Sequence, residues 1–252
     1  MNRATRKRVE RNLASARKEL ERLVGDDLTT VSRRLELGQY VETLELLEQG
    51  PAALAEAVLR ATERVVELEA SAFLKPADRD RIDCRAGCAW CCHQPLQVSP
   101  LDAVAMTHHL LPTLDRERLQ AYARDLSARL PFQREKLKTC FAPCPFLDSD
   151  TSLCTAYQSR PVVCRAFHST SVEHCRAIHD EQRPVRTVPM FELLMGFVGL
   201  PLEGAHRALA ELGVDLRPVV LGVAVALLAE DFEGLSRAWL AGERVFEPAV
   251  VS

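Results

Sequence analysis

The cysteines constrain this chain more than any other feature of its sequence. All nine lie within one stretch of a chain of 252 residues, at Cys84, Cys88, Cys91, Cys92, Cys140, Cys144, Cys154, Cys164 and Cys175. Thiols gathered so densely form disulfides, bind metal or lie inert in a core. The chain opens with basic residues rather than an apolar export signal, nine is an odd number, and 252 residues can bury a hydrophobic core without covalent bridges. We therefore expect a cytoplasmic protein whose reduced thiols bind metal.

The spacing of the cysteines indicates the kind of centre. The pairs Cys84/Cys88 and Cys88/Cys91 can each chelate one ion from a single turn of chain. Cys91 and Cys92 are adjacent, and successive side chains diverge from the backbone, so two neighbours rarely complete one tetrahedron. Two metals or a polynuclear cluster are therefore predicted. Two four-thiolate sites and one cluster with spare or redox-active thiols are equally compatible with the eight cysteines other than Cys140, and the sequence does not partition them.

The residues around the cysteines suit a thiolate centre. Thiolates are soft ligands that select zinc, copper(I) or iron-sulfur clusters, and four of them around zinc(II) leave a net charge of about minus two. Burying that charge calls for nearby cations, and four arginines lie near cysteines in sequence: Arg85, Arg160, Arg165 and Arg176. Three histidines near cysteines could replace a thiolate, although enough cysteines are present without them: His93, His168 and His174.

The segment between Cys144 and Cys154 has the composition of a turn. Pro143 and Pro145 exclude regular structure around Cys144, and residues 148–151 read Asp-Ser-Asp-Thr. Cys144 and Cys154 are therefore predicted to flank a tight reversal, in which Asp148 and Asp150 are solvated turn residues rather than metal ligands.

Several linked motifs run through this region. They are Cys84-x3-Cys88-x2-Cys91-Cys92, the helix start Val98-Ser99-Pro100-Leu101-Asp102, Cys144-Pro145-Phe146-Leu147, Cys154-x2-Tyr157-x2-Arg160-Pro161-x2-Cys164-Arg165-x-Phe167, and a trailing Cys175. The combination resembles the YkgJ family, a cysteine-cluster family described as a zinc- or iron-chelating domain, over roughly residues 84–175. The resemblance implies that the chain binds zinc or iron, with an iron-sulfur cluster as one form in which iron is held. The ligands that it implies are Cys84, Cys88, Cys91, Cys92, Cys144, Cys154 and Cys164, with Cys175 as the eighth. Cys140 falls outside the pattern and is left out of the ligand set.

Whether the chain is also an enzyme stays open. FliB-type lysine N-methylases carry a similar cysteine-cluster region linked to an iron-sulfur centre, which makes a shorter relative that acts on protein lysines one alternative. The sequence shows no Gly-rich strand-to-helix turn for a nucleotide-like cofactor. Cys84-x3-Cys88-x-Trp90-Cys91 also fits the radical S-adenosylmethionine pattern. That class needs a barrel of alternating strands and helices, whereas the periodicity here is mainly helical.

Helical periodicity dominates outside the cysteines. It predicts helices over residues 1–24, 27–36, 39–48, 51–75, 99–111, 115–130, 189–198, 202–212, 218–230 and 231–241. The first of these is amphipathic and basic, and it could contact a protein partner, although a solvated helical face is the commoner role of such a charge pattern. The apolar run from Val219 to Ala229 is too short to span a membrane and is predicted to be a core helix.

Composition completes the prediction. Hydrophobic residues at 47%, charged residues at 27% and a net charge of -3 are typical of a globular protein and indicate neither a nucleic acid nor a membrane as partner, and aromatic residues at 6% do not suggest base stacking. We expect a mainly α fold, a helical bundle that encloses a loop-rich cysteine metal-binding centre. It would comprise an N-terminal helical region (1–80), a cysteine-cluster domain (81–183) and a C-terminal helical region (184–252) packed on it.

Overall fold

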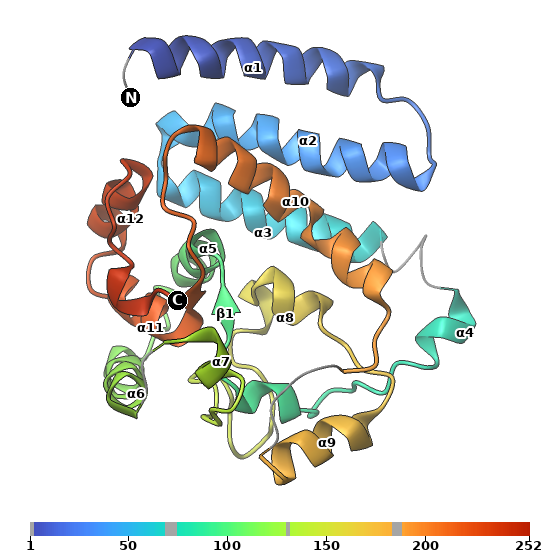
Figure 1. Cartoon of the computed structure of the whole chain (residues 1–252), viewed down its shortest axis with the longest axis vertical. Helices are drawn as coiled ribbons and strands as arrows, with labels where there is room; N and C mark the ends of the chain where they lie inside the picture. The colour runs from blue at the N-terminus through green and yellow to red at the C-terminus, as the bar shows by residue number, and fades with distance from the viewer. Residues whose placement is uncertain (1–2, 69–74, 130–131, 183–187) are drawn as a thin grey trace.

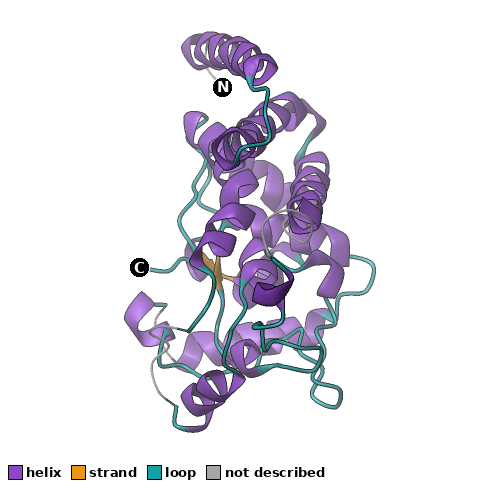
Figure 2. Ribbon diagram, turned by 90° about the vertical axis from the view of Figure 1, so that its right-hand side faces the viewer, coloured by secondary structure: helices purple, strands orange, loops and turns teal. Residues whose placement is uncertain are grey.

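The computed structural model describes residues 3–68, 75–129, 132–182 and 188–252, and most of these residues are helical (Figures 1 and 2). The longer helices are α1 (Arg3–Arg22), α2 (Leu28–Leu46), α3 (Pro51–Leu68), α5 (Pro100–Leu110), α6 (Arg116–Arg129), α9 (Val172–Asp180), α10 (Glu192–Glu211), α11 (Leu221–Leu228) and α12 (Phe232–Leu240). The shorter ones are α4 (Pro76–Arg79), α7 (Arg134–Leu137) and α8 (Val162–Ala166), with 3-10 turns η1 (Leu47–Gln49), η3 (Trp90–His93), η4 (Tyr157–Ser159) and η5 (Glu247–Ala249). The expected mainly α fold is confirmed.

Strand structure is minor. Within the described ranges the named strands are β1 (Gln97–Val98) and β2 (Val219–Val220), which pair antiparallel. Val219 and Val220 are both fully buried. The prediction of a helix from residue 218 is therefore wrong at its first residues, because this short apolar run pairs with β1 before α11 begins.

Helices α2 and α10 run side by side in the upper part of Figure 1. Gly204 of α10 makes this close approach possible, since a Cβ atom there would lie 2.0 Å from the backbone oxygen of Glu36 in α2. An ion pair of 2.7 Å between Arg207 and Glu36 ties the two helices at the same level. This close packing holds α2 and α10 against each other.

Two predicted helix breaks are therefore wrong. The sequence signals placed one break between residues 36 and 39 and another at residues 199–201, but α2 continues past Gly38 and α10 continues through Pro201. Leu37 and Tyr40, on either side of Gly38, are buried, and the α10 residues Ala205, Ala208 and Leu209 are buried beyond the proline. Tertiary packing thus outweighs the local cost of a helical Gly or Pro.

The remaining helix predictions agree with the structure where it describes the chain. Ser99 caps α5 by accepting the Asp102 N–H, with Pro100 in the first turn, as predicted. The predicted ends of two helices, residues 69–74 and residue 130, lie outside the described residues. The division into three regions stays a prediction.

Helix α1 lies at one end of the molecule and packs along α2 (Figure 1). Its apolar face contributes Val9 and Ala16 to a small core that also contains Leu37, Tyr40 and Leu44 of α2. The amphipathic pattern is thus accounted for by packing inside the chain. Its charged face remains exposed.

The largest core lies between α5, α6, α11 and α12. Leu101, Met106, Leu126, Leu228 and Trp239 are among its fully buried side chains. Helix α11 is almost entirely buried, which confirms the predicted core helix. No helix in the described part of the chain has the length and apolar character needed to cross a membrane.

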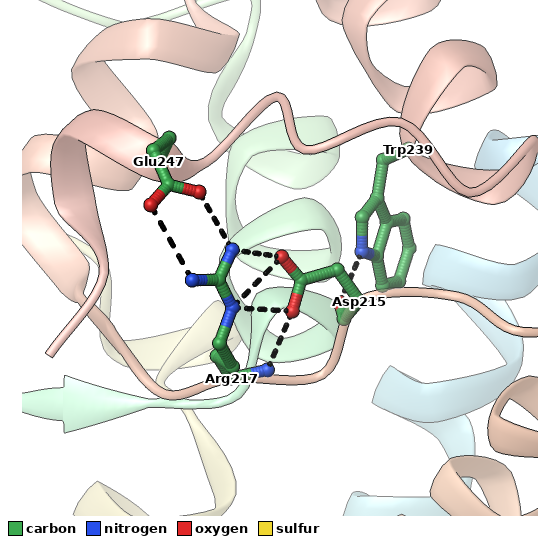
Figure 3. A network of polar contacts seen from close by, with 4 residues as sticks. All are labelled: Asp215, Arg217, Trp239 and Glu247. Atoms are coloured by element: carbon green, nitrogen blue, oxygen red, sulfur yellow. Dashed lines mark hydrogen bonds and ion pairs between the residues drawn. The ribbon is translucent and has the colours of Figure 1, made fainter. Parts of the chain in front are cut away.

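A polar network holds the C-terminal segment on this core (Figure 3). The Arg217 guanidinium donates to Asp215 at 2.6 Å and to Glu247 at 2.7 Å. The Trp239 indole donates to the Asp215 backbone oxygen at 2.7 Å. Because Trp239 is buried, this bond satisfies an N–H group that would otherwise be costly to bury.

Candidate metal centre

The cysteines lie on loops and short helices in the half of the molecule away from α1, where Figure 1 places α9 at the far end and α8 nearer the middle. All nine are free thiols rather than disulfides. Cys84 and Cys88 flank a turn in which the Cys88 N–H donates to the Arg85 carbonyl and Gly87 has a φ of 84°. Only glycine adopts that left-handed conformation without strain, so the turn that separates the first two sulfurs depends on it.

Backbone hydrogen bonds join the distant parts of the cysteine region. The Cys144 N–H donates to the Cys92 carbonyl at 2.7 Å, and the Ala142 N–H donates to the His93 carbonyl at 2.8 Å. The 142–144 loop is therefore held against η3, which carries Cys91 and Cys92.

The predicted reversal between Cys144 and Cys154 is confirmed. Leu147 forms an antiparallel bridge with Cys154, and the Asp148 carboxylate accepts the N–H groups of Asp150 and Thr151. These hydrogen bonds lower the pKa of Asp148 and show that it is a turn residue, as predicted.

Four cysteines interact with one another, and we call Cys92, Cys144, Cys154 and Cys164 the second cysteine group. Electrostatic interactions connect Cys164 with the other three, Cys144 with Cys92 and Cys154, and Cys154 with Cys92. Every pair within the group thus interacts. Four different segments of the chain supply these sulfurs: η3, the loop before the reversal, the loop after it, and α8.

Four other cysteines make up the first cysteine group: Cys84, Cys88, Cys91 and Cys175. The Cys84 thiol hydrogen-bonds with Cys88 and interacts with Cys175, and its sulfur also accepts the Ser169 N–H at 3.2 Å. Cys91 interacts with Cys84, and it lines a small cavity of about 40 Å³ together with Cys175. Cys91 also interacts with Cys164, so it lies between the two groups.

Helix α9 is anchored to the Cys84 turn by its N-terminus. The Val172 N–H donates to the Asp83 carboxylate at 3.1 Å, and the Asp83 N–H donates to the Ser169 carbonyl at 2.9 Å. Ser171 caps the helix by accepting the His174 N–H. These bonds bring Cys175, far away in sequence, to the first cysteine group.

The thiols differ in their acidity. Burial raises the pKa of Cys144 to about 12, and it also raises the pKa values of Cys84, Cys154 and Cys164. The Cys92 pKa is lowered to about 7, first because the Cys91 thiol hydrogen-bonds with Cys92 and then because of the charge of Arg160. Because burial disfavours the charged form of a thiol, these cysteines ionise only if a nearby cation stabilises the thiolate.

Arg160 is the cation that serves the second cysteine group. Its guanidinium stacks 3.9 Å from the centre of the Tyr157 ring and interacts with Cys92, Cys154 and Cys164. The Arg160 Nε atom is buried and finds no hydrogen-bond partner within the described chain. A buried N–H group without a partner, on a side chain that interacts with three thiols, fits a negatively charged thiolate centre.

The other arginines predicted to support the centre make different contacts. Arg85 donates to the backbone oxygen of Cys84, Arg165 donates to the backbone oxygen of Arg160, and Arg176 forms an ion pair with Asp180. These contacts hold the loops and α9, and Arg165 also interacts electrostatically with Cys164.

The eight sulfurs are grouped but do not form a completed coordination shell. Within the described ranges, no three His, Cys, Asp or Glu side chains are arranged as a group that could hold a metal ion. Thiolates repel one another, and ligand ordering is coupled to metal binding in such sites. The donor chemistry fits zinc or iron nevertheless, since both cysteine groups present reduced sulfur from several segments and the second adds a buried cation.

The predicted histidine alternatives lie in three different surroundings. His168 is buried and uses both ring nitrogens, with Nδ1 2.8 Å from the Ala166 carbonyl and Nε2 accepting the Phe191 N–H at 2.8 Å. It therefore joins α8 to the start of α10 and has no nitrogen left for a metal. His93 Nδ1 lies 3.0 Å from the Ala89 carbonyl, and His174 is exposed on α9.

His179 is a residue of the site that the sequence reasoning missed. It lines the same cavity as Cys91 and Cys175, with its ring 4.7 Å from His93 and 5.1 Å from Trp90, centre to centre. It follows Cys175 by four residues on α9, a spacing that places both side chains on one helix face. That i, i+4 spacing was the signal in the sequence.

Cys140 lies apart from both groups. It is 7% exposed and belongs to the main hydrophobic core together with Leu126 and Leu137. Burial raises its pKa, and the interacting groups next to it are Arg129 and Asp125 rather than other cysteines. Its surroundings are those of an inert buried thiol.

The comparison with family models agrees with this geometry. Residues 83–184 match the CxxCxxCC family, whose description reads "Putative zinc- or iron-chelating domain". This segment is thus similar to a CxxCxxCC domain, and the name is used below for residues 83–184. The match covers less than half of the chain and includes all nine cysteines. Comparisons with curated proteins and with solved structures found no match. The CxxCxxCC domain supports metal binding by the chain, without deciding between zinc and iron.

Proposed function

We propose that the CxxCxxCC domain holds two metal centres, each bound by four cysteine thiolates, with zinc or iron as the metal. The first cysteine group would hold one centre and the second cysteine group the other. The observation that carries this proposal is that every pair of thiols in the second group interacts. Cys91, whose thiol hydrogen-bonds with Cys92, also interacts with Cys84 of the first group, so it stands where the two groups meet.

The proposed role of the second centre is structural. Its four sulfurs come from η3, the two sides of the reversal and α8, so an ion bound there would fasten four separate segments of the chain to one another. A site with four protein ligands leaves no position for a substrate. Arg160 stabilises the negative charge of the four thiolates through its guanidinium.

The first centre has a different setting. It adjoins the 40 Å³ cavity lined by Cys91, Cys175, His179 and the ring of Trp90. That volume is enough for one small molecule next to the centre. Iron, including an iron-sulfur cluster, or zinc is proposed for this position.

Anaerobic purification followed by elemental analysis and an absorption spectrum tests the metal. Zinc at both centres gives two equivalents and a colourless protein, whereas an iron-sulfur cluster absorbs visible light and bleaches on reduction. A preparation without zinc or iron that also fails to bind either metal when supplied would overturn the proposal.

Paired substitutions test the partition. Cys92→Ser with Cys144→Ser should remove the metal of the second centre and leave the first, and Cys84→Ser with Cys175→Ser should do the reverse. Cys140→Ser is the matched control, because this thiol lies in the core, and it should keep the full metal content. Loss of all metal from either paired variant would instead indicate one polynuclear cluster, and loss from Cys140→Ser would refute the ligand set.

The enzyme alternatives receive no support from the comparisons. The lysine N-methylase alternative rests on the cysteine region alone. For the radical S-adenosylmethionine alternative, the strands in the described ranges are too few and too short to build the required barrel. A cytoplasmic location, which would keep the thiols reduced, remains part of the proposal.

A protein partner at α1 is proposed separately. The exposed face of this helix carries Arg6, Lys7, Arg11 and Lys18. An acidic surface would fit such a face, with binding that weakens as salt rises. Titration with poly-glutamate at two salt concentrations tests it, and equal binding by a variant with all four residues changed to Ser would rule out this face.

A further inference from the structure

A cleft of about 660 Å³ lies apart from both cysteine groups. Its walls come from β1, the start of α5, α7, α8, α10 and the segment before β2. No cysteine is among its lining residues. The volume falls within the range of small-molecule sites, which are concave, mainly apolar and equipped with a few polar groups.

Apolar side chains form the body of the cleft. Val163 and Ala166 line it from α8, Met195 and Leu202 from α10, and Leu216 from the segment before β2. Five apolar side chains from three segments define a surface that water solvates poorly. An apolar ligand body would gain free energy by covering it.

One end of the cleft is positively charged. Arg134 and Lys138, from α7 and its C-terminal end, both line it. Lys138 pairs with Glu135 at 2.6 Å, while the Arg134 side chain has no hydrogen bond or ion pair to any described residue. An arginine that is free to pair, next to a lysine, suits a carboxylate or another small anion.

The other titratable groups of the cleft do not cancel this charge. The Asp102 carboxylate is buried, accepts the Val162 N–H at 3.1 Å and the Ser99 hydroxyl at 3.0 Å, and is therefore engaged within the protein. Burial lowers the pKa of His206 to about 4, which leaves the imidazole neutral at pH 7. The charge open to a ligand is thus positive.

We propose that this cleft binds a small amphipathic anion, with its apolar body between α8 and α10 and its anionic group paired with Arg134 and Lys138. The chemical class is that of a monocarboxylate with a hydrocarbon body. This site is separate from the metal centres and does not depend on how the cysteines are partitioned.

Gly199 provides a steric test. It lines the cleft from α10, its φ lies outside the left-handed region, and a Cβ atom built on it meets no atom within 4 Å. A Gly199→Phe substitution therefore places a ring in open space at the cleft without breaking the helix. Gly196 is the matched control, because it lies one turn earlier on the same helix, its Cβ is equally unobstructed, and it does not line the cleft.

The probe is the fluorescent anion 1-anilinonaphthalene-8-sulfonate, displaced by decanoate, on the full metal-loaded chain. Gly199→Phe should weaken binding of both molecules by about tenfold or more, while Gly196→Phe binds like the parent. Equal binding by both glycine variants would overturn the proposal. Metal content, measured in the same samples, should stay unchanged and shows that the variants fold.

Charge substitutions test the anionic end. Arg134→Ala with Lys138→Ala should weaken decanoate about tenfold, and Arg116→Ala, an exposed arginine on α6 outside the cleft, should not. Decanol should bind the parent more weakly than decanoate does, and it should bind the double variant as well as it binds the parent. Equal affinity of the parent for decanoate, decanol and decyltrimethylammonium would refute the assignment of an anion.

Discussion

The two tryptophans of the chain stand in two contrasting regions. Trp239 is 0% exposed, lies against Phe246 in the main core and donates its indole N–H to the Asp215 carbonyl. Trp90 is only partly buried and contacts His179 beside the first cysteine group. The first belongs to a body held by apolar packing, and the second to the segment around the first cysteines, where such packing is sparse.

Burial along the chain shows how far the two regions differ. In α11, every residue but one is buried. Between Ile82 and His93, by contrast, Ala89 is the one buried residue. Apolar burial is the main source of folding free energy, so the helical body can be stable by itself while the first cysteines need another source of order. Under the proposed function, metal coordination supplies it, because in such sites the free energy of binding contributes directly to folding.

Removal of the metal should produce the largest difference between the two regions, because only the cysteine region is expected to lose its order. Structural zinc contributes about 10–16 kcal/mol in zinc-finger peptides, which exceeds the stability that loop hydrogen bonds alone provide. For the zinc-loaded chain, we expect a chelator to change the emission of Trp90, measured in Trp239→Phe. The emission of Trp239, measured in Trp90→Phe, should stay as it was, and amide exchange should accelerate in residues 82–93 but not in α2, α5 or α10. Simultaneous change of both emissions would show that the body depends on metal as well.

A substitution in the helical body should instead lower the stability of the body and leave the metal content unchanged. Gly204→Ala brings a Cβ atom to 2.0 Å from the Glu36 backbone oxygen, so α2 and α10 must move apart. We expect urea unfolding to show a loss of about 3 kcal/mol, with metal content unchanged. Gly196→Ala on the same helix meets no atom within 4 Å and should raise stability by about 0.5–1 kcal/mol. A Gly204→Ala protein as stable as the parent would show that this helix pair does not limit the stability of the body.

A smaller effect concerns pH and His206 in α10. Burial lowers its pKa from 6.5 to about 4, so below pH 6.5 the unfolded chain binds a proton that the folded chain does not. The contribution to stability is complete above pH 6.5 and is lost as the pH falls toward 4. We expect about 2 kcal/mol of lost unfolding free energy from this group between pH 7 and pH 5. His206→Leu should remove that part of the pH dependence, and an unchanged difference between the two pH values would contradict it.

The sequence predicted most of what local signals determine. The Ser99 cap of α5, the reversal between Cys144 and Cys154 and the buried character of α11 depend on residues within a few positions of one another. The continuity of α10 through Pro201 does not, because contacts with α2 decide it. The local Pro signal therefore predicted a helix break at this position, whereas packing keeps the helix continuous.

The candidate site divides in the same way. The eight cysteines could be selected from spacing and resemblance, and that set stays a prediction. Their separation into two groups depends on which loops meet, as when the Cys144 N–H reaches the Cys92 carbonyl. Periodicity carries no information about such long-range bonds. The cleft could not be predicted from the sequence either, since its walls come from five separated segments of the chain.

Helix α8 takes part in both proposed sites. It is five residues long, its Val162 N–H is fixed by the Asp102 carboxylate, and Cys164 stands directly after Val163 of the cleft wall. A helix this short moves as one piece, so a molecule that displaces Val163 also displaces the Cys164 sulfur. Such coupling is reciprocal: if an anion in the cleft changes the affinity for metal by some factor, the metal changes the affinity for that anion by the same factor.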